Sequence, residues 1–168
     1  MGEDAPGNGS GAGVKIDLDL RKLTDALVRV EAVADELPQI AQTVQQEALG
    51  HMVIAANRSV YDTTAGAYER TGDYRRGFQS RGRGTRHTAS VTVWNDVEYA
   101  PYIEYGTGPY EMTAEQIVQQ AAVNPMAPLY FGRSGEQFMV AGPAVYPAAV
   151  FAAYRMRELF AKAITEAL

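Results

Sequence analysis

The chain has 168 residues, of which 46% are hydrophobic and 21% are charged, so it is long enough to form one domain with its own core. It contains no cysteine, which excludes disulfides and thiolate metal sites, and its net charge of -5 argues against general nucleic-acid binding. No apolar run approaches the about 20 residues that a membrane span requires.

The first 13 residues, "MGEDAPGNGSGAG", lack the basic and apolar regions of a secretory signal. Their Gly, Ser and Pro content predicts a flexible tail that packing on a neighbouring chain would order. We expect residues 14–168 to form a single domain. Its first segment, "VKIDLDL" at 14–20, alternates apolar and polar residues, which suits a short strand or an extended lead-in.

Two helices are predicted next, because apolar residues recur at helical spacing on both sides of a proline. Pro38 fits the first turn of the second helix, where a missing N–H costs nothing. We therefore predict a break or kink near Leu37–Pro38. The predicted apolar positions are Leu20, Leu23, Leu27, Val30 and Ala34 in the first helix and Ile40, Val44, Ala48, Met52 and Ala55 in the second.

Residues 61–86 are predicted to form a long, arginine-rich loop with one helical turn around Tyr74–Phe78. Its first 24 residues include no Val, Leu or Ile. Residues 70–86 carry six arginines and one aspartate, a local balance of +5, which leaves nine basic and nineteen acidic residues, or -10, in the rest of the chain. Loops of this length inside a compact domain are usually functional or disordered.

Two interpretations of these arginines stay open. Arg75, Arg76, Arg81, Arg83 and Arg86 are able to contact several phosphates on a nucleic acid. Alternatively, the segment pairs with acidic surface on a neighbouring copy of the chain. The acidic balance of the remaining chain favours pairing with protein.

The second half of the chain alternates short apolar segments with helices. "TASVTVW" at 88–94 predicts a strand with Ala89, Val91 and Val93 on its buried face. Thr113 and Gln116 form a capping-box pattern that begins a helix over 113–124. Residues 129–142 resemble a β-hairpin. A last helix runs from Pro147, with an apolar stripe of Ala149, Ala153, Met156, Phe160, Ala163 and Ala167.

This order of elements predicts an α+β domain, in which a small, mostly antiparallel sheet packs against the N-terminal helices and a long C-terminal helix. We expect no catalytic, cofactor or metal site. The only histidines are His51 and His87, and the chain contains no metal-ligand spacing, phosphate loop or nucleophile elbow.

The segment "VEYAPYIEYGTGPY" at 97–110 is too aromatic for an ordinary solvated loop. Tyr99, Tyr102 and Tyr105 have the three-residue spacing that places side chains on one side of a helical turn. They either cover the edge of this domain's core, with their hydroxyls in water, or form a contact surface for another chain. Both interpretations are able to hold for different rings.

Three stretches together resemble the tail-completion, or neck, proteins of long-tailed bacteriophages, also described as minor tail or head–tail joining proteins. They are "RTGDYRRGF" at 70–78, "NDVEYAPYIEYGTG" at 95–108 and "GPAVYPAAVFAA" at 142–153. The middle stretch is the most specific. The resemblance spans residues 16–168, and Tyr74 stands where the family often has Leu.

The resemblance implies a structural virion protein without catalysis and without a cofactor. Such a protein forms a homo-oligomeric ring, a hexamer in the usual case, at the head-proximal end of the tail. Its partners are the tail tube or tail terminator and the head-completion proteins, and DNA passes through the lumen without specific binding. It is assembled in the host cytoplasm.

Tail terminator and head-side stopper are close alternatives within this class, and a nucleic-acid-binding module that uses the arginines is the alternative from another class. The candidate interface residues are Arg70, Arg75, Arg76, Arg81, Arg83, Tyr99, Tyr102, Glu104, Tyr105 and Gly106.

Overall fold

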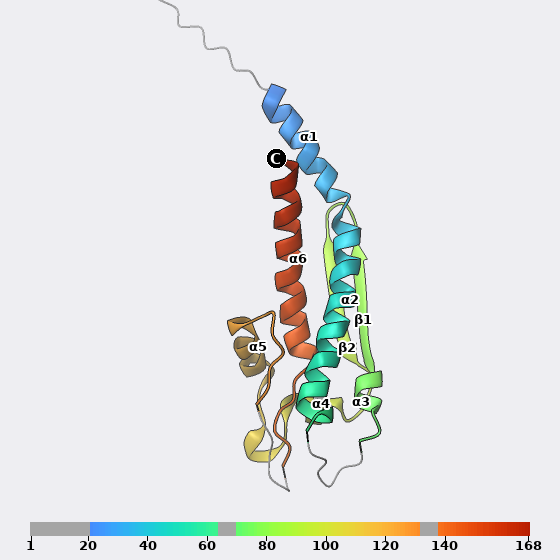
Figure 1. The fold of residues 1–168 in the computed structure, drawn as a ribbon, viewed down its shortest axis with the longest axis vertical. Helices are drawn as coiled ribbons and strands as arrows, with labels where there is room; N and C mark the ends of the chain where they lie inside the picture. The colour runs from blue at the N-terminus through green and yellow to red at the C-terminus, as the bar shows by residue number, and fades with distance from the viewer. Residues whose placement is uncertain (1–20, 64–69, 132–137) are drawn as a thin grey trace, which may run out of the picture.

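The computed structural model describes residues 21–63, 70–131 and 138–168. Within them the protein is an elongated α+β domain built on two long helices that pack along each other, α2 (Leu37–Ala56) and α6 (Val145–Ala167) (Figure 1). The predicted fold class is thereby confirmed. The predicted tail and the predicted strand at 14–20 lie outside the described residues.

The N-terminal helix α1 (Arg21–Ala34) and α2 are separated near Leu37–Pro38, as predicted. All five predicted apolar positions of α2 are buried. The prediction for α1 was less accurate, because Leu27 is 60% exposed while Val33, which was not among the predicted positions, is buried. The helix continues beyond the rest of the domain (Figure 1), so much of its surface has no partner element to bury it.

The predicted loop over 61–86 is wrong where a strand occupies Phe78–Gly84, whereas the helical turn predicted around Tyr74–Phe78 is present over Asp73–Arg76. A π-helical turn, η1 (Asn57–Tyr61), extends α2, and a short helix, α3 (Asp73–Arg76), leads into a seven-residue strand, β1 (Phe78–Gly84). Residues 64–69 lie outside the described residues. A real strand therefore occupies the segment "FQSRGRG", in spite of its glycines.

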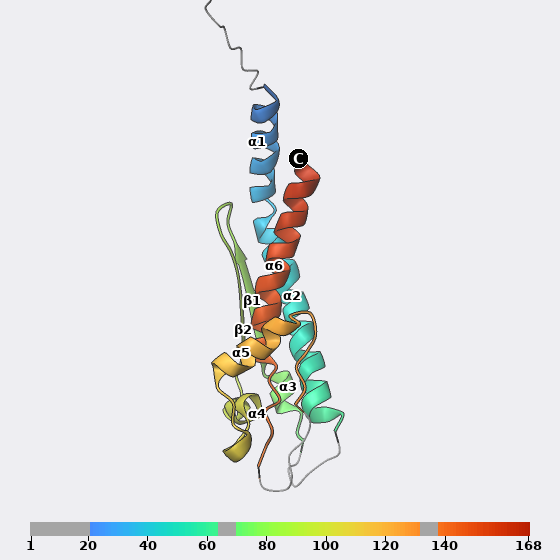
Figure 2. The ribbon, with the colours of Figure 1, turned by 90° about the vertical axis from the view of Figure 1, so that its left-hand side faces the viewer.

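Strand β1 pairs antiparallel with β2 (Ala89–Asn95), the strand that the alternation at 88–94 predicted. Gly82 faces Val91 and Arg83 faces Ser90 across the two strands. The two strands form a ribbon that lies along one side of the two long helices (Figure 2). The glycines are required there: a Cβ on Gly82 would approach the Ala41 carbonyl oxygen of α2 to 2.5 Å.

After the ribbon come α4 (Ala100–Tyr105), a 3₁₀ turn η2 (Gly108–Tyr110) and α5 (Ala114–Val123). The capping box of Thr113 and Gln116 at the start of α5 is confirmed. The predicted hairpin over 129–142 is not seen, because none of its described residues forms a strand. The backbone N–H groups of Thr107 and Gly142 bond instead to Met139 and Ile103 respectively.

The core follows the length of α2. At the end near α4, a cluster centred on Met52 includes Tyr74, Phe78, Ile103 and Ala148. Further along, Val44 packs with residues of α6 and with the inward valines of β2. The predicted stripe on α6 is displaced around the helix: Ala149, Ala153 and Phe160 are exposed, whereas the buried α6 residues are Pro147, Ala148, Phe151 and Ala152.

Candidate functional site

The three stretches that carry the family resemblance meet at one buried side chain, Glu104. Its Oε1 accepts a hydrogen bond from the Tyr74 hydroxyl at 2.6 Å and from the backbone N–H groups of Ala144 and Val145, each at 2.9 Å. Tyr74 comes from the first stretch, Glu104 from the second, and Ala144 and Val145 from the third. We call these four residues the Glu104 junction.

The Glu104 junction caps the start of α6. The N-cap residue, Ala144, has no side chain that can accept the first free N–H groups of the helix. Glu104 supplies the missing acceptor from α4, and its negative charge is favourable beside the positive end of the helix dipole. The junction therefore joins α4 to α6 and fixes the direction in which α6 leaves the chain.

Two opposing effects act on the pKa of Glu104. Burial raises the pKa of its carboxyl, while the hydrogen bonds from Tyr74, Val145 and Ala144 act in the lowering direction, and the net result is a raised pKa. Its second oxygen, Oε2, is buried and has no hydrogen-bond partner among the described residues. Burial also raises the pKa of Tyr74 well above its ordinary value, so Tyr74 remains a donor at neutral pH.

The residues after Glu104 hold the chain on either side of the junction. Tyr105 and Tyr146 share a hydrogen bond of 2.6 Å between their hydroxyls, which raises the pKa of Tyr105 to about 12. Thr107 bonds to Met139 twice, through its backbone N–H and through its hydroxyl, at 2.8 Å each. These contacts fasten residues 139–146 against α4.

Gly106 makes the sharp exit from α4 possible. It has φ +76° and ψ -170°, a conformation that is essentially restricted to glycine. A Cβ there would lie 2.7 Å from the Tyr110 carbonyl oxygen and 2.8 Å from the Ala141 nitrogen. Glu104 and Gly106, both predicted at an interface, are thus buried within the chain and hold its own fold together.

The tyrosines of this segment divide between the inside and the outside. Tyr105 is half-buried and bonded to Tyr146, whereas Tyr99 is 41% and Tyr102 is 61% exposed. Ala100 and Ile103 of the same short helix face the core. The two interpretations of this segment thus apply to different rings: Tyr105 is held against its own chain, whereas Tyr99 and Tyr102 project from a helix that is anchored beneath them.

The predicted arginine cluster also divides. Arg70 bonds to the backbone carbonyl of Tyr61 and to Thr63. Arg75 bonds to the Asn57 side chain at 3.0 Å and lies over the Tyr61 ring at 4.9 Å. These two arginines fasten α3 and the segment before it to the end of α2.

Two further arginines form ion pairs inside the chain. Arg76 pairs with Asp73 within α3. Arg86, at the tip of the ribbon, pairs with Asp35 at 2.6 Å and lies 3.6 Å from Glu31 of α1. The acidic partners that the sequence placed on a neighbouring copy are, for Arg86, in its own chain.

Only Arg81 and Arg83 of the predicted arginines keep free guanidinium groups in the described part of the chain. They alternate with Gly82 and Gly84, so both are exposed on the outer face of β1 while the glycines face α2. Ser90 and Thr92 lie opposite them on β2. This face of the ribbon is basic and polar.

The described residues contain no group of three or more potential metal ligands. His51 is buried against the Phe151 ring at 4.9 Å, both its nitrogens lack partners there, and burial lowers its pKa, so it is a neutral core residue at pH 7.

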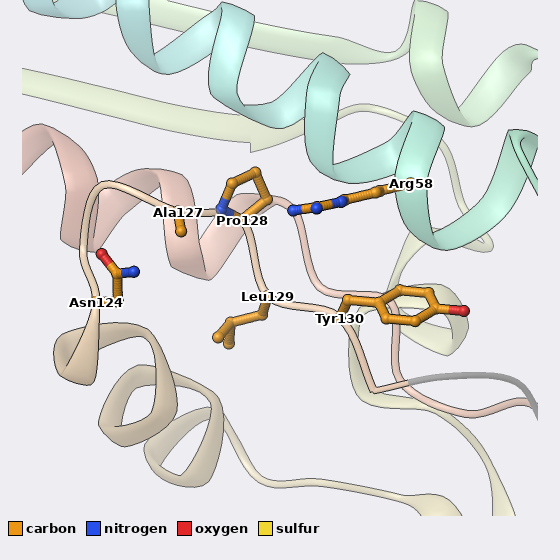
Figure 3. Close-up of a pocket in the computed structure, with 6 residues that line it drawn as sticks. All are labelled: Arg58, Asn124, Ala127, Pro128, Leu129 and Tyr130. Carbon is orange, nitrogen blue, oxygen red and sulfur yellow. The ribbon is translucent and has the colours of Figure 1, made fainter.

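An open depression of about 520 Å³ is lined by Arg58, Asn124, Ala127, Pro128, Leu129 and Tyr130 (Figure 3). Polar groups come from Arg58, Asn124 and the Tyr130 hydroxyl, and apolar surface comes from Ala127, Pro128 and Leu129. No predicted site residue lies in it.

Several structural roles escaped the sequence. Side chains that connect elements far apart in the chain include Gln45, Tyr146 and the ion pair of Arg155 with Glu47. The nitrogen–oxygen distances of that ion pair are 2.8 and 3.2 Å. The one sequence signal is the place of Gln45 beside Val44 in the apolar stripe of α2, where an amide is able both to donate and to accept a hydrogen bond.

Comparisons with protein-family models, with curated proteins and with solved structures found no match. Among the described helices, none has the length and apolar character needed to cross a membrane.

Proposed function

We propose that this protein is a structural component of a bacteriophage virion, which forms a symmetric ring at the head-proximal end of the tail and joins the tail tube to the head-completion proteins. The ring is a homo-oligomer, a hexamer in this proposal, and it acts without catalysis or cofactor. It assembles in the host cytoplasm. Tail terminator and head-side stopper are alternative positions for the same kind of ring.

The observation that carries the proposal is that the segment 95–108 has inward side chains that anchor it and outward side chains that are free to contact another chain. Its inward residues, Ile103, Glu104 and Gly106, attach α4 to the core and to the start of α6. Its outward residues, Tyr99 and Tyr102, are thereby presented on a fixed backbone. Large tyrosine side chains held in this way lose little conformational entropy on binding, which is why tyrosine is common at protein interfaces.

The structural roles of the buried ionisable groups also support this class of function. Among the described residues, the buried polar or charged ones are His51, which packs in the core, and Glu104, which caps α6. A buried carboxyl that joins α4 to the start of α6 suits a mechanical joining role. The three stretches that meet at the Glu104 junction resemble bacteriophage tail-completion proteins, and this resemblance is the reason for proposing this particular ring.

The test is to replace Tyr102 by Asp, which places a charge on the exposed ring position without disturbing the core. Tails are then assembled in cells that make no heads, and their upper ends are examined for this protein. We expect soluble, folded protein that is not incorporated. Val123→Asp is the matched control, because Val123 is 81% exposed at the end of α5, away from α4.

Normal incorporation of Tyr102→Asp, and of the equivalent change at Tyr99, contradicts the proposed contact surface. A chain that is absent from purified particles altogether contradicts the virion function itself.

Nucleic-acid binding is the second candidate function, and the exposed pair Arg81 and Arg83 favours it. With only two free guanidinium groups on the face, the expected dependence of DNA binding on salt is shallow. Retention of the protein on DNA that falls with rising salt, and that disappears when both arginines become Glu, supports this candidate over the ring.

A further inference from the structure

The two edges of the β1–β2 ribbon differ in whether their outward backbone groups are hydrogen-bonded. On β1, the Gln45 side chain accepts a hydrogen bond from the Gly82 N–H at 2.9 Å and donates one to the Ser80 carbonyl at 3.2 Å. A single amide thus occupies two of the outward groups that a further strand would use, the Ser80 C=O and the Gly82 N–H. The β1 edge is closed against pairing with another chain.

The β2 edge is open. In an antiparallel pair the residues opposite Ser80 and Gly82 must also direct their N–H and C=O groups away from the partner strand. These residues are Val93 and Val91. No hydrogen bond joins those outward groups to any residue in the described part of the chain. The ribbon thus offers one edge at which a third strand can be added.

We propose that residues 14–20 of a neighbouring copy add to this edge as a third strand. The inference rests on the ring-forming function proposed above and names the contact that joins one subunit to the next. A strand donated from each chain to the following one is a head-to-tail contact, which closes into a ring when the rotation fits. Strand addition of this kind draws its affinity from backbone hydrogen bonds.

The chain's own segment cannot fill the edge. The tip of the ribbon lies at the start of α2, since a Cβ on Gly84 would collide with Pro38. From there α1 runs away from the ribbon for 14 residues (Figure 1), or about 21 Å. The seven residues 14–20, even fully extended, span at most about 25 Å. A segment of this length that folded back along α1 would be too short to reach Val93.

The pattern of the segment matches the two faces of the ribbon. Ile16 and Leu18 fall on one side of an extended chain and Asp17 and Asp19 on the other. On the inner side, Val91 and Val93 pack beside Met156, and Phe160, one turn further along α6, is 37% exposed. The apolar side of the added strand covers this uncovered flank.

On the outer side the two aspartates lie near the basic face. Arg81 and Arg83 project from β1 on that face, one strand beyond Ser90 and Thr92. Long arginine side chains reach across one strand spacing of about 4.8 Å. Charge complementarity therefore favours the aspartate-bearing segment of a second copy over a basic or neutral strand from another protein.

The absence of cysteine in the chain makes disulfide trapping a clean test. One full-length chain carries Lys15→Cys, Asp17→Cys or Asp19→Cys, and a second chain carries Ser90→Cys or Thr92→Cys. The two are mixed and oxidised. The control acceptor is Gln79→Cys, which lies on the same face but on β1, where the Cα distance to a strand added at β2 is about 9.6 Å and too long for a disulfide.

We expect covalent pairs between the two mixed chains with a β2 acceptor, and loss of these pairs with Gln79→Cys. A synthetic peptide of residues 12–22 should suppress them. Val91→Pro should also abolish them while the circular dichroism spectrum stays native, because that proline removes only an outward N–H. Equal yields with the β2 and β1 acceptors, or pairing that survives Val91→Pro, overturn the proposal.

The strand contact and the ring function fail separately. If deletion of residues 14–20 leaves the protein normally incorporated at tail ends, the strand contact is wrong and the ring function stands. If the specific covalent pairs form but the protein is absent from particles, the strand contact stands and the virion function is wrong.

Discussion

The Tyr74 hydroxyl donates a 2.6 Å hydrogen bond to Oε1 of Glu104, 30 residues further along the chain, and both side chains are buried. This pair joins the short helix α3, which precedes the ribbon, to α4, and through the backbone of Ala144 and Val145 to α6. Three elements that are distant in sequence thus depend on one carboxylate oxygen.

The first prediction is that Tyr74→Phe lowers the free energy of unfolding by about 1.5–3 kcal/mol, the usual range for a hydrogen bond to a charged group. The ring itself is retained, so its packing against Phe78 remains. Urea unfolding followed by circular dichroism measures the loss. The control is Tyr99→Phe, which removes a hydroxyl from an exposed ring and should change stability by less than about 0.5 kcal/mol. Equal effects of the two changes contradict the role of the Glu104 junction.

The second prediction concerns pH. The pKa of Glu104 is raised in the folded state above its ordinary value of 4.5. The folded state therefore binds a proton more readily than the unfolded state. The contribution of this group to stability is fully present below pH 4.5 and is lost as the pH rises through the folded pKa. Compared with Glu104→Gln, the wild-type protein should lose stability over that interval and then remain level.

Asp73 and Glu115 act in the opposite direction, since hydrogen bonds lower the pKa of each. Their contributions are lost as the pH falls. Both residues are present in the wild type and in Glu104→Gln, so the difference between the two proteins isolates Glu104. Urea unfolding at a series of pH values from 4 upward measures that difference. If the wild-type protein instead gains stability relative to Glu104→Gln as the pH rises, the raised pKa is contradicted.

The sequence predicted the elements whose burial follows a regular period. The stripe from Ile40 to Ala55 on α2 and the alternation from Ala89 to Val93 on β2 are both covered on one side by another element, so hydrophobicity alone located them. The capping box at Thr113 is a local pattern, complete within four residues. These features depend little on the rest of the fold.

The elements that the sequence missed depend on distant partners. Strand β1 has glycines where a strand usually has large residues, because α2 approaches its inner face too closely for a Cβ at Gly82. Those glycines made the segment look like a loop. The start of α6 lacks a cap of its own, and Glu104, some 40 residues earlier, supplies it. No local pattern reveals either arrangement.

For the same reason the candidate interface was only partly predictable. The tyrosine spacing suggested a shared surface, but it could not separate Tyr105, which bonds to Tyr146, from the exposed Tyr99 and Tyr102. The arginines looked equivalent in sequence. Their separation into internal partners and the outward pair Arg81 and Arg83 follows from the strand alternation that was missed.

The third prediction compares two glycines. Gly106→Ala should destabilise the fold by more than about 1–3 kcal/mol, because φ +76° with ψ -170° is unfavourable for alanine and the new Cβ collides with backbone. Gly50→Ala should stabilise it by about 0.5–1 kcal/mol, because Gly50 lies within α2 and a Cβ there meets nothing within 4 Å. Thermal and urea unfolding measure both. A tolerated alanine at 106 contradicts the tight exit from α4.

The last prediction is that Gln45→Ala opens the β1 edge of the ribbon. The change removes two hydrogen bonds, to Gly82 and Ser80, and we expect a loss of about 1–3 kcal/mol in the free energy of unfolding. It also exposes a second pairing edge, so sedimentation should detect larger and less uniform species than the wild type forms. Gln46→Ala is the matched control, since Gln46 is the adjacent, exposed glutamine of the same helix. If Gln45→Ala loses stability but associates no more than Gln46→Ala, the amide holds the ribbon to α2 without guarding its edge. In that case the difference between the two edges no longer explains why a neighbouring strand would add to β2 alone.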